Sequence, residues 1–112
     1  MEDCLFCKLI NGNDNKVFEN ELFYIIKDIS PQAPLHYLAI PKTHFKYLKD
    51  MSFLEAQNLG KIFARIAEIA ETTLGLFGGY RLVINQGDNA GQTVPHLHIH
   101  ILGGKEMGWN PA

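Results

Sequence analysis

The sequence lacks most of the features that mark specialised classes of protein. Its 112 residues leave no room for a second domain of ordinary size. No apolar run approaches the roughly 20 residues that cross a bilayer, and the chain opens with Met-Glu-Asp rather than a basic and then apolar leader. The net charge is -2, and no run of Lys or Arg forms the basic stripe that a nucleic-acid polymer requires. We therefore expect one cytoplasmic domain spanning residues 1–112, with neither a membrane nor a nucleic-acid polymer as partner.

Cysteine is also scarce, because Cys4 and Cys7 are the only two. One pair two residues apart cannot staple a fold in the way that secreted disulfide frameworks do. The spacing is that of a zinc knuckle, but no second close pair follows, so any further ligands must come from distant parts of the sequence. Two free thiols are the alternative interpretation.

The residues that are present predict a small globular protein. Hydrophobic residues make up 46% and charged residues 20%, which disfavours disorder. In chain order we expect a short helix over 4–10, strands over 17–19, 22–27 and 36–40, a long helix from Ser52 to Gly75, and strands over 80–85 and 97–102. This order lacks repeated strand–helix alternation, so we predict an α+β fold. It would be an antiparallel five-stranded sheet with one long helix and one short N-terminal helix.

The long helix carries the clearest local signals. Ser52 and Glu55 have the spacing of a capping box, and Gly75 offers a left-handed stop. An apolar stripe with helical spacing faces one way, formed by Leu59, Ile62, Phe63, Ile66 and Ala70. This stripe predicts a helix packed on one face of the sheet, and we assign it no ligand.

Three histidines alternate with apolar residues in the run His96-Leu97-His98-Ile99-His100. In a strand, alternation places the three rings on one face and the apolar side chains on the other. The first and third histidines would then lie about 13 Å apart, too far for one zinc ion to bind all three. The rings must divide their roles, and neutral imidazole is a competent nucleophile toward phosphorus. A half-exposed strand that happens to alternate with histidine is the simpler alternative.

The loop that precedes the histidines, Gln86 to Thr93, has the composition of an anion-binding turn. Gly87 and Gly91 tolerate backbone conformations that could turn the loop amides toward one point. Taken alone, a plain connection between strands explains this loop equally well. Beside the histidines, we expect a phosphate cradle.

The run from His96 to Leu102 resembles the His-φ-His-φ-His-φ-φ signature of the histidine triad (HIT) family of nucleotide-binding hydrolases and transferases. Further segments are similar to the Hint-type branch of that family, in the right order: 28–34, His36, 40–42 with His44, 91–94 and 102–104. The resemblance covers nearly the whole chain. It implies the fold predicted above and a site for a purine nucleotide.

The resemblance also implies roles for individual residues. The nucleotide-binding set would be Asp28, Ile29, Asn85, Gln92, Thr93, Val94, His98 and His100. Asp28 would accept hydrogen bonds from the ribose hydroxyls, although Asp before Ser-Pro is also a common turn former. Gln92 and Thr93 would contact the phosphate, and the family more often has Ser where Thr93 stands. The catalytic set would be His36, His96, His98 and His100.

The zinc-carrying members of the family close the metal tetrahedron with two histidines that correspond to His44 and His96. The resemblance therefore implies a structural zinc ion on Cys4, Cys7, His44 and His96. It also implies a homodimer in which Trp109 reaches the partner's substrate pocket. Gly108 and the ending Asn110-Pro111-Ala112 depart from the usual tail.

The activity implied by the Hint-type branch is that of a purine nucleoside phosphoramidase. His98 would attack the α-phosphate of an AMP-amine adduct and form a covalent nucleotidyl-histidine that water hydrolyses. His36 and His100 would hold or move protons and stabilise phosphate charge. Cleavage of dinucleoside polyphosphates, nucleotidyl transfer, and a nucleotide-binding module without turnover are the alternatives.

Overall fold

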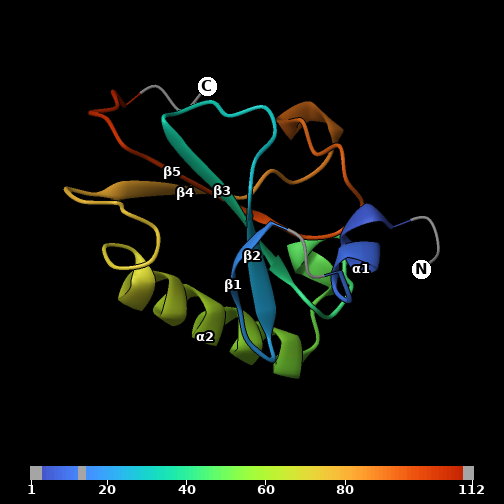
Figure 1. Cartoon of the computed structure of the whole chain (residues 1–112). Coiled ribbons are helices and arrows are strands. Elements are labelled where there is room, and N and C mark those ends of the chain that lie inside the picture. Colours follow the sequence, from blue (N-terminus) through green and yellow to red (C-terminus); the bar gives the residue numbers. More distant parts are fainter. Residues whose placement is uncertain (1–3, 13–14, 110–112) are drawn as a thin grey trace.

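Five short strands rich in aromatic and β-branched residues pair into one antiparallel sheet with the order β1-β2-β3-β5-β4 (Figure 1). The structure is a computed structural model that describes residues 4–12 and 15–109; residues 1–3, 13–14 and 110–112 lie outside it. The elements are α1 (Leu5–Leu9), β1 (Lys16–Glu19), β2 (Phe23–Lys27), β3 (Leu35–Pro41), α2 (Phe53–Ile69), β4 (Tyr80–Val83) and β5 (Ile99–Gly103). The predicted α+β class is confirmed.

The sheet has two different faces. Helix α2 covers one face (Figure 1). Its buried residues Leu59, Ile62 and Ile66 pack against alternate side chains of β2, β3 and β5. On the other face the five-residue helix α1 packs against Tyr24, Leu38 and Ile40. The main core therefore lies under α2, while α1 covers only part of the opposite face. Within the described ranges, neither α1 nor α2 is long and apolar enough to cross a membrane.

The start of α2 follows the prediction, but its end does not. Ser52 caps the helix, and its hydroxyl and the Glu55 carboxylate accept each other's backbone amides, at 3.1 and 2.8 Å. The regular helix ends at Ile69 rather than at Gly75. The amide of Leu74 donates back five residues to Ile69, and that of Leu76 donates back six to Ala70, so the last turns are wider than an α-helix.

Strand β5 also begins later than predicted, at Ile99 rather than Leu97. The preceding residues 94–96 form a bend, in which the amide of His96 donates to the carbonyl of Val94 at 2.9 Å, and the amide of Leu97 donates to the carbonyl of Phe45 at 2.7 Å. His96 and His98 are therefore presented by a segment outside the sheet. Strand β4 likewise ends two residues early, at Val83.

Candidate active site and metal-binding cluster

The half of the sheet that α1 leaves uncovered forms the floor of an open cleft of about 390 Å³. The register pairs His36 with Leu102, Arg81 with Leu102 and Val83 with His100, so all five side chains lie on the face opposite α2. The walls come from Gln32, Asn85 and the tail residues 105–108. The cleft is thus a consequence of the short α1, which stops before reaching β4 and β5.

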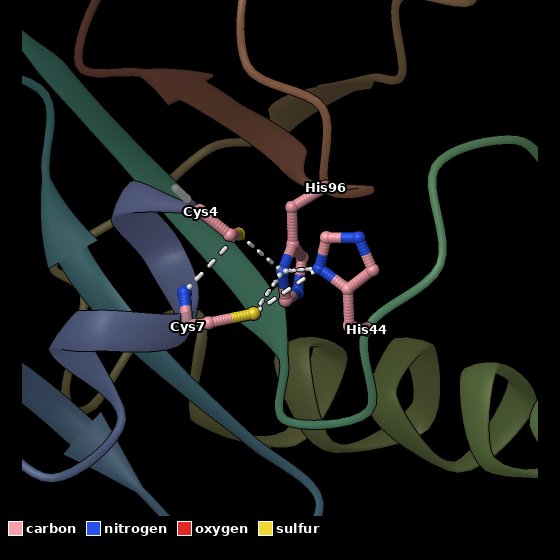
Figure 2. A group of neighbouring side chains, drawn as sticks. All are labelled: Cys4, Cys7, His44 and His96. Atoms are coloured by element: carbon pink, nitrogen blue, oxygen red, sulfur yellow. Dashed lines mark hydrogen bonds between the residues drawn. The ribbon is translucent and has the colours of Figure 1, made fainter. Parts of the chain in front are cut away.

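Cys4, Cys7, His44 and His96 converge at one end of the histidine run, and we call them the metal-binding cluster (Figure 2). Nδ1 of His96 lies 3.3 Å from Cys4 Sγ, 3.5 Å from Cys7 Sγ and 3.2 Å from His44 Nδ1. Cys7 Sγ lies 3.1 Å from His44 Nδ1. For a tetrahedral zinc ion, neighbouring ligand atoms are about 3.3 Å apart for two nitrogens and about 3.5 Å for nitrogen and sulfur. The four side chains could therefore hold one metal ion with little movement.

The surroundings of the metal-binding cluster orient its donor atoms. Nε2–H of His96 donates to the Pro41 carbonyl at 2.7 Å, which leaves the Nδ1 lone pair directed at the cluster. The amide of Cys7 donates to Cys4 Sγ at 3.3 Å, the usual environment of a metal thiolate. Without a cation, burial and the neighbouring Cys4 raise the pKa of the Cys7 thiol to about 11. Burial lowers the pKa of His96, which favours the neutral, ligating form.

His98 lies between the metal-binding cluster and the cleft. Its Nδ1–H donates to the backbone carbonyl of His96 at 2.9 Å, which fixes the tautomer with a lone pair on Nε2. No described residue bonds to that Nε2, and no buried side-chain nitrogen in the described ranges lacks a partner, so Nε2 reaches the surface. The ring packs edge-to-face against His100, with the centroids 5.1 Å apart.

Asp28, His36 and His100 form a second group, which we call the cleft cluster. His36 Nε2 lies 2.9 Å from His100 Nδ1 and 3.3 Å from an oxygen of Asp28. The amide of Gln32 donates to His36 Nδ1 at 3.0 Å, so the proton of neutral His36 must reside on Nε2 and point at His100 or Asp28. Burial lowers the pKa of His36, and burial with the two neighbouring histidines lowers the pKa of His100 to about 4.

The loop before the histidines differs from the predicted cradle. Gly87 and Gly91 both have the expected positive φ, of 83°. However, the amides of Ala90, Gly91 and Gln92 donate to carbonyls inside the loop, and the Gly87 amide donates to the side chain of Gln92. These amides are occupied, so they do not form an open anion cradle.

Gln92 and Asn85 brace this loop. The side-chain amide of Gln92 donates to the carbonyl of Lys46 at 3.1 Å, while its oxygen accepts from Gly87 at 2.9 Å. The amide group of Asn85 donates to the Ala90 carbonyl at 2.8 Å, and Asn85 also lines the cleft. Thr93 is exposed, and Val94 is half-buried against the apolar residues between α1 and the sheet.

Two residues predicted at the site are fully exposed in the single chain. Ile29 is 98% and Trp109 93% accessible, which is unusual for large apolar side chains without a partner. Asp28 is half-buried beside Ile29, where one carboxylate oxygen accepts the Ser30 amide at 2.8 Å and the other faces His36. The predicted turn-forming role of Asp28 is therefore present together with its position at the cleft cluster.

Sequence reasoning missed four contributors to the site. These are the ring of Phe6, the amide of Gln32, and the cleft-floor residues Arg81 and Val83. Strand parity could have placed Arg81 and Val83, because both align in register with the histidine-bearing face. A backbone amide such as that of Gln32 leaves no signal in the residue type.

Comparison with known proteins identifies the family. A model described as the HIT domain matches residues 11–107. The chain belongs to the HIT family. An uncharacterized HIT-like protein of Chlamydia trachomatis is 45% identical over 109 residues, covering 93% of this chain and 95% of that protein.

Solved HIT structures have the same fold. A HIT family hydrolase from Clostridium thermocellum is 43% identical with a TM-score of 0.90, covering 100% of this chain and 99% of the other. A zinc-bound histidine triad family protein from Mycobacterium smegmatis is 33% identical with a TM-score of 0.77, covering 93% of this chain and 76% of the other. The relatives described as hydrolases favour a hydrolase, and the spacing of Cys4, Cys7, His44 and His96 could accommodate a metal ion.

Proposed function

We propose that this HIT protein is a purine nucleoside phosphoramidase in which His98 is the nucleophile. One observation carries the proposal: Nδ1–H of His98 is bonded to the His96 carbonyl at 2.9 Å, so the lone pair of neutral His98 lies on the accessible Nε2. A nucleophilic imidazole needs this tautomer, with one nitrogen held and the other free.

In the first step, the Nε2 lone pair forms a bond to the α-phosphorus, and the bond from phosphorus to the amine nitrogen breaks. The departing amine takes up a proton from solvent, and the nucleotide remains on His98. In the second step, a water oxygen attacks the same phosphorus, the bond to Nε2 breaks, the water gives up a proton to solvent, and the nucleoside monophosphate leaves. Dividing one difficult displacement into two steps is the advantage of a covalent intermediate.

His100 is proposed to donate a hydrogen bond to a phosphate oxygen. Because the Gln32 amide occupies Nδ1 of His36, the proton of His36 lies on Nε2. Nε2–H can then donate a hydrogen bond to Nδ1 of His100 at 2.9 Å. His100 then carries its own proton on Nε2. Because the pKa of His100 falls to about 4, this neutral state persists through physiological pH.

The nucleotide is proposed to bind in the space from the turn at Asp28 to the loop over residues 86–93. Asp28 retains unused lone pairs for the ribose hydroxyls. Ile29 offers an exposed apolar surface to the base, and Thr93 an exposed hydroxyl to the phosphate. Asn85, Gln92 and Val94 would shape this phosphate side. Since its amide braces the loop, Gln92 acts mainly through the position of Thr93.

Zinc is the proposed metal of the metal-binding cluster. Two thiolates and two imidazole nitrogens at tetrahedral spacing suit Zn²⁺, and four protein ligands leave no open position. When bound, the ion supplies structural cross-linking between α1, the segment after β3, and the segment before β5. We also propose a homodimer in which the exposed Trp109 contacts the partner's pocket.

The test compares wild type with His98→Ala and with the control Lys61→Ala, which changes an exposed residue of α2 on the other side of the sheet from the cleft. Hydrolysis of a fluorogenic adenosine phosphoramidate is followed, with AMP binding measured by calorimetry and the nucleotidyl adduct by mass spectrometry. We expect His98→Ala to lose activity by about 1,000-fold or more while still binding AMP. Equal rates in wild type and His98→Ala would exclude His98 as nucleophile. If wild type binds AMP without turnover, the protein is a nucleotide-binding module. If it cleaves dinucleoside polyphosphates in preference to the phosphoramidate, it is a dinucleoside polyphosphate hydrolase.

A further inference from the structure

His98 requires a positional restraint that the sheet does not supply. It precedes β5, which begins at Ile99, so no ladder hydrogen bonds hold its backbone. In the described chain its backbone is anchored only through its two neighbours, by the Leu97 amide on the Phe45 carbonyl and by the pairing of Ile99 with Ala39. The side-chain anchor is the Nδ1 bond to His96. Apart from the edge-to-face contact with His100, whose ring centroid lies 5.1 Å away, this hydrogen bond is the only one from the described residues that limits tilting of the imidazole.

The ring of Phe6 blocks that remaining movement. Phe6 is 4% exposed, and its centroid lies 5.1 Å from that of His98, with the two planes at 74°. It also lies 6.0 Å from the His96 ring at 79°. Edge-to-face contacts of this kind fix relative ring orientation. Because the Phe6 side chain has no hydrogen-bond donor, it does not occupy the Nε2 lone pair of His98.

Phe6 is itself held by the metal-binding cluster. It lies on α1 between Cys4 and Cys7, and a five-residue helix has too few internal hydrogen bonds to be stable alone. Its position is set by the two flanking cysteines and by the Tyr24 hydroxyl, which donates to the Phe6 carbonyl at 2.6 Å. The same cluster contains His96, whose carbonyl holds the other side of His98.

We propose that Phe6 is a positioning residue for His98, carried by the metal-binding turn of α1. The inference rests on the proposed nucleophilic role of His98. The turn from Cys4 to Cys7 then has two roles, because Phe6 orients the His98 imidazole while the two cysteines bind the metal. Replacing the ring then slows formation of the bond between Nε2 and phosphorus without weakening nucleotide binding.

The experiment uses the metal-loaded protein and four variants. Phe6→Leu and Phe6→Met remove the ring, Phe6→Tyr retains it, and Ile26→Ala truncates the same apolar cluster two strands away from β5. For each protein, metal content, AMP affinity and the single-turnover rate of adduct formation on His98 are measured. The ring N–H proton of His98 is followed by NMR as a direct report on its bond to His96.

We expect the ringless variants to form the adduct about 10- to 100-fold more slowly, with AMP affinity within about threefold of wild type. Metal content should remain at one per chain, while the His98 N–H signal broadens or exchanges faster. Phe6→Tyr and Ile26→Ala should stay within about threefold of the wild-type rate.

Three results would overturn the inference. These are an unchanged rate in Phe6→Leu and Phe6→Met, an equal loss in Ile26→Ala, or loss of the metal in both ringless variants, which would make the role of Phe6 structural. If wild type forms no adduct at all, the proposed function itself fails, and that outcome is distinct from the other three.

Discussion

The two ends of the histidine run are built from similar groups but have different chemistry. In the metal-binding cluster His96 and His44 nitrogens lie 3.2 Å apart beside two thiols. In the cleft cluster His36 and His100 nitrogens lie 2.9 Å apart beside a carboxylate. In both groups the donor atoms lie within 4.8 Å of one another, so spacing alone would admit a metal ion at either end.

The difference lies in the backbone groups behind the rings. The Pro41 carbonyl takes the proton of His96 on the far side, so the near nitrogen presents a lone pair. The Gln32 amide occupies the far nitrogen of His36, so the near nitrogen carries a proton. The metal-binding cluster therefore has converging lone pairs suited to a cation, whereas the cleft cluster has a proton between two rings. One backbone group behind each histidine, a carbonyl or an amide, determines which nitrogen carries the proton.

The largest effect should come from breaking the metal-binding cluster. In Cys7→Ser we expect metal content to fall from one per chain to near zero, because a tetrahedral site loses a thiolate. The free energy of unfolding should fall by about 4 kcal/mol, the linkage value for a metal present at about 1,000 times its Kd. Metal analysis and urea unfolding measure the two quantities. His36→Gln is the matched control and should retain its metal; loss of metal in that variant would remove the distinction between the two ends.

The pH dependence of stability should sharpen the comparison at the cleft end. The pKa of His100 is about 4 when folded and about 6.5 when unfolded, so below pH 6.5 the unfolded chain binds the extra proton. The free energy of unfolding should therefore fall as pH decreases from 7 toward 4, by up to about 3 kcal/mol from this group. His100→Asn should lack this part of the slope. Because both proteins keep the metal ligands, the difference between their urea-unfolding curves isolates His100, and identical slopes would contradict the assignment.

The smallest effect is expected at Asp28. Its oxygen lies 3.3 Å from His36 Nε2, but burial lowers the pKa of His36, so at pH 7 the carboxylate lies beside a neutral ring and does not form an ion pair. Asp28→Asn should change the free energy of unfolding at pH 7 by less than about 1 kcal/mol. The loss of AMP-binding free energy in Asp28→Asn should be larger than this change in stability. Asp88→Asn on the exposed loop is the control and should change neither quantity. A large loss of stability in Asp28→Asn would indicate a charged His36.

The sequence predicted the architecture well because local patterns and packing agree. Alternation in residues 96–102 placed the histidines and the apolar residues on opposite sides, and the capping box located the start of α2 to the residue. The predicted beginning of β5 was wrong because alternation of residue types does not show where strand pairing starts. His96 lies in a bend and His98 outside the ladder, and their rings are bonded to backbone carbonyls.

The candidate site was predicted by residue type but not by proton position. The spacing of about 13 Å expected for His96 and His100 in a regular strand predicted two environments, and the structure places the two histidines in separate clusters. The amide of Gln32 and the carbonyls of Pro41 and His96 decide the tautomers, and every residue carries such groups. The end of α2 failed for a related reason: Gly75 has the left-handed φ expected of it, at 69°, but the turns before it had already widened.

The dual use of His96 has a consequence for the interpretation of mutant data. Its side chain belongs to the metal-binding cluster, whereas its carbonyl, which no side-chain substitution removes, belongs to His98. Substitutions in the metal-binding cluster and at Phe6 should therefore be non-additive in a double-mutant cycle, since both act on one imidazole through one short stretch of backbone. Replacing the amide after His96 by an ester would weaken the carbonyl as an acceptor and also remove the Leu97 N–H that donates to the Phe45 carbonyl. It would therefore loosen both backbone restraints on His98 while leaving every side chain in place.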